Sequence, residues 1–255
     1  MIFRSNSLLQ KLKNGQACRG AWLFLGSPDA TEVMGLAGFD ALVIDHEHSP
    51  GGLETAIHQM RAIRAAGDAT ILARLGENNV AEIKRLLDAG VEGLLLPNVE
   101  SAEDARRFVA ACQYPPAGIR GAHFTVSRAA AWGSAGDEYY RNIDQQLLLV
   151  AMIESKKGAD AIAEIAAVEG LHMLFIGPLD LTGSVGKMGQ YRDEEVAALM
   201  KKAEQGALAS GKLLGGAMVP GERASDCFAR GFRFVTVGSD VGLLRAGAAS
   251  ALLGA

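Results

Sequence analysis

Charged side chains stand where several short apolar runs of this chain stop. A buried strand that ends at a charge can be accidental once. Four such ends, in a chain of alternating strands and helices, predict one shared site at one end of a parallel barrel. The runs and the charges that follow them are 41–44 with Asp45, 70–73 with Arg74, 147–153 with Glu154, and 172–178 with Asp180.

Two of these residues are carboxylates at the ends of neighbouring strands. Glu154 and Asp180 present hard oxygen ligands, which suit a divalent cation such as Mg²⁺ or Mn²⁺ with water and substrate completing its coordination. The alternative for Asp180 is a helix N-cap, because Leu181 and Thr182 follow it. The pair therefore predicts a metal site, with a structural cap as its rival.

A histidine follows the second strand. His48 is a candidate general base, since an imidazole titrates near neutral pH, and His46 is its rival. No cysteine or third histidine stands nearby in the sequence, which argues against zinc. Three further histidines are expected to be structural: His58, His123 and His172.

Arg74 ends the third strand, where its planar fork can hold a carboxylate or a developing enolate oxygen. Its alternative is a salt bridge at the rim of the barrel. Asp45 is placed to orient a neighbouring His or Arg, and Asp88 by itself reads as a solvated charge on a helix. No lysine ends an apolar strand, which disfavours Schiff-base chemistry.

The elements that must position these residues alternate along the chain. Nearly continuous apolar runs are typical of parallel strands covered on both faces, and eight of them, each followed by a helix, give the count of a (β/α)8 barrel. A long insertion, 113–146, holds a short helix over 137–146. The expected strands are 19–25, 41–45, 70–74, 93–97, 147–153, 172–177, 213–218 and 233–238. The expected helices are 29–37, 52–66, 79–89, 101–112, 158–168, 191–210, 221–230 and 240–253.

Composition fits one large α/β domain over residues 1–255. The 255 residues are 49% hydrophobic and 21% charged, enough for a well-buried core. A net charge of -4 gives no indication of a basic face for nucleic acid or anionic membrane. The three cysteines are far apart and odd in number, which predicts reduced thiols and a cytoplasmic location.

Several long motifs, in order, resemble the HpcH/HpaI aldolase family of metal-dependent class II pyruvate aldolases, and within it the 2-dehydro-3-deoxyglucarate and 4-hydroxy-2-oxoheptanedioate aldolases. The resemblance covers nearly the whole chain. The matching segments are 31–40, 45–50, 83–90, 114–121 (Tyr-Pro-Pro-Ala-Gly-Ile-Arg-Gly), 153–155, 175–181 (Phe-Ile-Gly-Pro-Leu-Asp-Leu) and 237–240.

The resemblance implies a barrel of the phosphoenolpyruvate/pyruvate type, with an exchanged C-terminal helix, in a homohexamer built as a trimer of dimers. It implies reversible aldol cleavage in sugar-acid or aromatic catabolism, yielding pyruvate and an aldehyde. The cofactor would be Mg²⁺, Mn²⁺ or Co²⁺. By the resemblance, Glu154 and Asp180 would ligate the metal, and the backbone of Leu179 and Asp180 would hold the pyruvate carboxylate. Arg74 would stabilise the enolate. His48 would be the base, and Asp88 of a neighbouring subunit would contact His48.

Two positions depart from the family pattern. Met152 stands where the family often has a Gln that contacts substrate, and His46 stands where it has Gly. Both changes leave the natural aldehyde open. Two alternatives also stay open. The first is a related enolate lyase or decarboxylase that acts on oxaloacetate or an acyl-CoA; for an acyl-CoA, Arg120 and Arg128 are the candidate basic residues at the mouth. The second is a barrel that binds a small acid without turnover.

Overall fold

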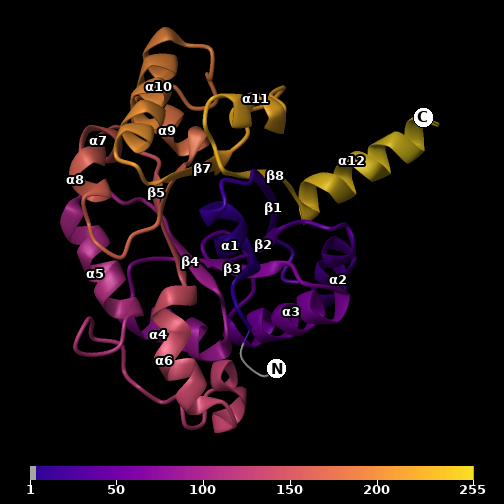
Figure 1. The fold of residues 1–255 in the computed structure, drawn as a ribbon. Coiled ribbons are helices and arrows are strands. Elements are labelled where there is room, and N and C mark those ends of the chain that lie inside the picture. Colours follow the sequence, from indigo (N-terminus) through magenta and orange to yellow (C-terminus); the bar gives the residue numbers. More distant parts are fainter. Residues whose placement is uncertain (1–3, 255) are drawn as a thin grey trace.

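The computed structural model describes residues 4–254, and both ends of the predicted 1–255 domain lie outside the described residues. Eight parallel strands close into a barrel in chain order, with β1 pairing with β8, and helices surround it (Figure 1). The predicted (β/α)8 fold is confirmed. The strands are β1 Cys18–Leu23, β2 Ala41–Asp45, β3 Thr70–Arg74, β4 Gly93–Leu96, β5 Leu148–Ile153, β6 Met173–Ile176, β7 Leu213–Ala217 and β8 Phe234–Ser239.

The helices begin within a few residues of their predicted starts, because local capping signals set them. Asn79 accepts hydrogen bonds from the N–H groups of Ala81 and Glu82 at the start of α4, as expected for an N-cap. The helices that follow the strands or lie in the insertion are α2 Pro28–Leu36, α3 Leu53–Ala66, α4 Val80–Ala89, α5 Ala102–Cys112, η1 Arg128–Gly133 (a 3₁₀ helix), α6 Gly136–Gln146, α7 Lys156–Asp160, α8 Ile162–Ala166, α9 Pro178–Ser184, α10 Glu194–Ala209, α11 Ala224–Ala229 and α12 Asp240–Leu253.

Three helical features differ from the expectation. The segment 158–168 is two short helices, α7 and α8, that meet at Ala161. Helix α9 occupies the loop after β6, and helix α1, Ser7–Lys13, precedes the barrel. The buried side chains of α1 are Leu8, Leu9 and Leu12, which belong to the cluster inside the barrel, so α1 closes its N-terminal end.

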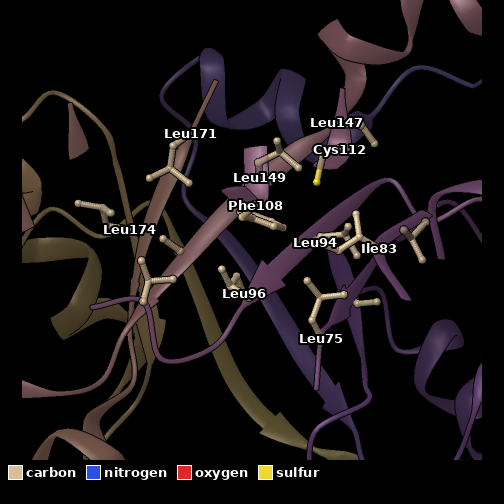
Figure 2. Close-up of a cluster of buried hydrophobic side chains, with 14 of the residues drawn as sticks. Leu75, Ile83, Leu94, Leu96, Phe108, Cys112, Leu147, Leu149, Leu171 and Leu174 are labelled. Atoms are coloured by element: carbon tan, nitrogen blue, oxygen red, sulfur yellow. The ribbon is translucent and has the colours of Figure 1, made fainter. Parts of the chain in front are cut away.

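Two hydrophobic clusters hold the fold together. One fills the barrel interior, and the other lies between the strands and the surrounding helices. Figure 2 shows the outer cluster where α5 covers the barrel: Phe108 and Cys112 lie against Leu94, Leu96 and Leu149. Burying large apolar side chains of this kind contributes roughly 1.5–3 kcal/mol each.

The last helix, α12, extends away from the barrel and carries the C-terminal end of the chain (Figure 1). Asp240 anchors its start, since its carboxylate accepts from the backbone N–H groups of Phe24 and Leu25 at 2.9 and 3.0 Å. Within residues 4–254, no helix combines the length and the apolar character needed to cross a membrane. The exposed large apolar side chains of α12 are Leu243, Leu244, Leu252 and Leu253.

Candidate active site

The inward-facing register of the strands carries charged side chains to the mouth of the barrel. Successive side chains on a strand point to opposite faces, so the residue two places beyond an interior position points the same way. On three strands, the residue two places beyond the last interior side chain is charged and therefore also points inward. The pairs are Val43 and Asp45, Leu72 and Arg74, and Met152 and Glu154.

Arg74 is held from three sides and is only 6% exposed. Its Nε donates to Asp45 Oδ1 at 2.5 Å, and its Nη1 lies 2.9 Å from Glu47 Oε2. The guanidinium carbon lies 4.6 Å from the centre of the Trp22 ring, a cation–π distance. The expectation that Asp45 orients a neighbouring side chain agrees with this contact. Arg74 also forms ion pairs, as its structural alternative predicts, but these are buried rather than exposed at the rim.

Glu154 is a buried carboxylate that follows β5. Its Oε1 accepts from the backbone N–H of Asn98 at 2.6 Å. Its other oxygen faces Gly177, where an added Cβ would lie 2.6 Å from Oε2, so only glycine leaves room for it. Burial, together with the charges of Glu47 and Asp180, raises the pKa of Glu154 to about 7 despite the hydrogen bond from Asn98.

Four carboxylates share this site, those of Asp45, Glu47, Glu154 and Asp180, and sequence reasoning missed the role of Glu47. Burial raises its pKa although Arg74 opposes the shift, and Asp45 and Asp180 add to it. Asp180 lies exposed in the first turn of α9, whose N-cap is Gly177, so the alternative of Asp180 as an N-cap is wrong. Glu47 is a loop residue beyond the end of β2, where strand periodicity no longer indicates direction.

The donor set fits a divalent cation. Two carboxylates at neighbouring strand ends offer hard oxygens, and the charges of Glu47 and Asp180 add to burial in raising the pKa of Glu154, so the site favours a positive charge beside it. Across residues 4–254, no group of three or more His, Cys, Asp or Glu side chains is spaced to hold a metal by itself. A cation held by Glu154 and Asp180 would therefore complete its coordination with water and substrate.

The two adjacent histidines point to different surroundings. The side chain of His48 is 63% exposed, its Nε2 lies 3.7 Å from Glu47 Oε2, and its backbone N–H donates to Asp45 Oδ2 at 2.7 Å. The side chain of His46 is 9% exposed, and its Nδ1 lies 3.3 Å from Glu82 on α4. Of the two, His48 is the one beside the carboxylates of the mouth.

The remaining predicted substrate contacts line the same end of the barrel. Met152 is buried inside the barrel, opposite Phe175 in the β5–β6 register. Leu179 is half-exposed, next to Asp180 in the first turn of α9. A thioether donates no hydrogen bond, so Met152 offers the site an apolar wall.

Asp88 is not brought to this site within one chain. It lies at the C-terminal end of α4, next to the start of β4 and thus at the opposite end of the barrel, and accepts from Arg120 Nη2 at 2.8 Å. Arg120 is fully buried and also donates to Tyr139, while Arg128 donates to the carbonyl of Ala89. The expectation that Arg120 and Arg128 stand at the mouth, where an acyl-CoA would need cations, is therefore wrong.

The other histidines and the cysteines lie away from the mouth. His172 Nδ1 accepts from Leu149 N–H at 3.2 Å, and burial lowers its pKa to about 4, so it is a neutral structural acceptor. His58 is exposed on α3, and His123 is exposed in the insertion. The cysteines are buried and unpaired: Cys18, Cys112 and Cys227.

Comparison with known proteins places this architecture among metabolic enzymes. The model of the HpcH/HpaI aldolase/citrate lyase family matches residues 19–246. A hydroxypyruvate/pyruvate aldolase of Delftia acidovorans is 37% identical over 246 residues, covering 96% of this chain and 90% of that protein. A 5-keto-4-deoxy-D-glucarate aldolase of Salmonella arizonae is 39% identical over 229 residues, covering 89% and 88%.

A solved structure shares the whole architecture. It is the crystal structure of an HpcH/HpaI aldolase/citrate lyase family protein from Burkholderia cenocepacia J2315, with a TM-score of 0.91 and 34% identity. The match covers 98% of both chains, so it includes every strand end that carries the site.

Proposed function

The chain belongs to the HpcH/HpaI aldolase/citrate lyase family, and on that premise we propose that it catalyses the reversible, metal-dependent aldol cleavage of a 4-hydroxy-2-oxo acid to pyruvate and an aldehyde. The observation that carries this proposal is the buried Arg74, fixed by Asp45 and Glu47 beside the carboxylates of Glu154 and Asp180. The site thus pairs one preorganised cation with a negative cluster suited to a second.

The second cation would be divalent: Mg²⁺, Mn²⁺ or Co²⁺, held by Glu154 and Asp180. When bound, it supplies Lewis-acid polarisation of the substrate's keto group and carboxylate. The backbone N–H groups of Leu179 and Asp180 lie in the first turn of α9, where such groups lack intrahelical acceptors, and they would bind the substrate carboxylate. Met152 would contact the pyruvate moiety through its apolar side chain alone.

Arg74 would stabilise the charge that develops on the keto oxygen. Asp45 and Glu47 engage its Nε and Nη1 and so fix the guanidinium at the mouth of the barrel. A donor fixed in advance costs little reorganisation during the reaction, which is the basis of oxyanion stabilisation.

His48 would be the base. It takes the proton of the C4 hydroxyl, directly or through water, and the C4–O bond becomes the aldehyde carbonyl as the C3–C4 bond breaks. The electron pair of that bond forms the pyruvate enolate, which is then protonated at C3. The exposed His48 side chain can reach a substrate and exchange its proton with solvent.

We also propose a homohexamer in which α12 packs on a second subunit. The exposed Leu252 and Leu253 at the end of α12 and its projection from the barrel support an exchanged helix. Asp88, remote from its own His48, would act on the His48 of a neighbouring subunit, with Arg120 holding one carboxylate oxygen. Light scattering of the full chain and of a Leu252→Asp variant tests the assembly, since the variant should dissociate.

The three buried, unpaired cysteines support a reducing, cytoplasmic location, and we propose that residues 1–255 form one catalytic domain.

Deuterium exchange into the methyl group of pyruvate, followed by proton NMR, tests the proposed function without a guess about the aldehyde. We expect exchange with Mg²⁺ or Mn²⁺, loss with EDTA, and loss in Arg74→Ala. If no divalent metal supports exchange, the proposal is wrong, and an acyl-CoA lyase or a non-catalytic acid-binding barrel takes its place.

A further inference from the structure

A groove opens beside the candidate site, at the C-terminal ends of β1, β7 and β8. Its volume is about 460 Å³, and its walls are mostly apolar. A volume of this size accommodates the substituent of a small aldehyde. The apolar side chains that line it are Trp22, Phe24, Met218, Val219, Val237 and Leu243.

The groove adjoins the candidate site through Trp22, a residue that contacts both. Trp22 forms part of its wall and also stacks on the Arg74 guanidinium, with 4.6 Å between the guanidinium carbon and the ring centre. Phe24 lies 5.9 Å from Trp22 in a stacked arrangement and extends the same surface. A substrate whose keto oxygen meets Arg74 therefore has this surface beside the carbons that follow.

The polar groups of the groove already have partners. Thr236 Oγ1 accepts from Trp22 Nε1 at 3.0 Å, and Ser239 Oγ accepts from the N–H of Gly242 at 3.0 Å. Glu222 forms an ion pair with Arg230. The Thr236 and Ser239 hydroxyls each keep their own O–H as a donor, but two side-chain hydroxyls are fewer than a polyhydroxylated chain needs, so such a substituent would lose hydration without full replacement.

The charge of the groove disfavours an acidic substituent. None of the described residues that line it is Lys, Arg or His, and its one ionisable side chain is the carboxylate of Glu222. Because the ion pair with Arg230 offsets the charge of Glu222, a distal carboxylate on the aldehyde would be desolvated without a side-chain cation on the groove walls to pair with it.

We infer that this groove binds the aldehyde half of the substrate and selects aldehydes with an uncharged aliphatic or aromatic substituent over those with a carboxylate or a polyhydroxylated chain. The inference rests on the proposed function and narrows its substrate class. Each methylene buried in the groove should raise kcat/KM about threefold to fourfold.

The test measures aldol addition of pyruvate to four aldehydes with Mg²⁺ or Mn²⁺ and quantifies products by NMR. Benzaldehyde and hexanal represent the apolar class, and succinic semialdehyde and D-glyceraldehyde the charged and polyhydroxylated classes. We expect kcat/KM for benzaldehyde and hexanal to exceed that for the other two at least tenfold. Preference for either polar aldehyde overturns the inference.

A Met218→Lys variant places a cation in the groove, with Val126→Lys, on an exposed loop of the insertion, as the matched control. The ratio of kcat/KM for succinic semialdehyde to that for benzaldehyde does not depend on the amount of folded enzyme. We expect this ratio to rise at least tenfold in Met218→Lys and to stay constant in Val126→Lys; an unchanged ratio in Met218→Lys contradicts the assignment.

Deuterium exchange of pyruvate distinguishes a failure of the groove assignment from a failure of the proposed function. Wild-type enzyme that exchanges the pyruvate methyl protons but prefers a polar aldehyde refutes the groove alone. Wild-type enzyme that shows no exchange refutes the proposed function on which the groove depends.

Discussion

Replacing Glu154 with Gln should stabilise the metal-free protein at alkaline pH. The carboxyl pKa of Glu154 is raised from an ordinary 4.5 to about 7, chiefly by burial. Below pH 4.5 the Glu154 carboxyl is protonated in both the folded and the unfolded chain, so it does not lower the free energy of unfolding. As the pH rises from 4.5 to 7 the unfolded chain ionises first, and the folded state loses stability until both forms are charged.

The size of this effect follows from the shift. A pKa raised from 4.5 to about 7 corresponds to about 3 kcal/mol above pH 7 and to less than about 1 kcal/mol at pH 5. Gln keeps an oxygen that can accept from Asn98 N–H and removes the buried charge. In a chain of this length, about 3 kcal/mol raises Tm by roughly 6–12 °C.

Thermal unfolding in EDTA at pH 8.5 and pH 5 measures the effect, with Glu169→Gln, an exposed position, as the matched control. Mg²⁺ should raise Tm of the wild type and leave the Glu154→Gln variant unchanged, because only the wild type keeps both carboxylates. The reasoning is refuted if Glu154→Gln is no more stable than wild type at pH 8.5 in EDTA, or if its advantage is equal at pH 5.

Three further results are expected. Gly177→Ala should reduce pyruvate exchange at least tenfold, because the added Cβ would displace the Glu154 carboxylate. Gly52→Ala, where the added Cβ lies in open space, should leave exchange unchanged. Full exchange in Gly177→Ala would contradict the packing of Gly177 against Glu154. Asp45→Asn should lower the free energy of unfolding by about 1.5–3 kcal/mol and reduce exchange, since it removes one of the two carboxylates that pair with the buried Arg74 guanidinium. Urea unfolding that shows a change below about 0.5 kcal/mol would argue against the pair. The Mg²⁺ affinity measured by calorimetry should fall about tenfold per pH unit below 7, because Glu154 must lose its proton to bind the cation. Equal affinity at pH 6 and pH 8 would contradict the assignment of Glu154 as a ligand.

Much of the barrel could be predicted because its signals are local. Apolar runs that stop at Asp45, Arg74 and Glu154 mark strand ends, and parallel topology brings those ends together. The alternation of side chains even gives their direction, since each continues the inward phase of its strand.

Other features depend on contacts between distant segments. Asp88 and Arg120 are 32 residues apart, and no sequence pattern indicates that Arg120 folds beneath the barrel to pair with it. Beyond the end of a strand the alternation is lost, so His46 and Glu47 carry no signal of direction. The short helix α9 was hidden because the Gly177-Pro178 sequence reads as the end of a strand.

The measurement that tests the central claim most directly is the relaxation of the pyruvate methyl protons by enzyme-bound Mn²⁺. The site predicts strong paramagnetic relaxation in the wild type, loss in Glu154→Gln and in Asp180→Asn, and wild-type relaxation in Glu169→Gln. Equal relaxation in all four proteins would mean that Glu154 and Asp180 do not hold the cation beside pyruvate, and the proposed site would have to be abandoned.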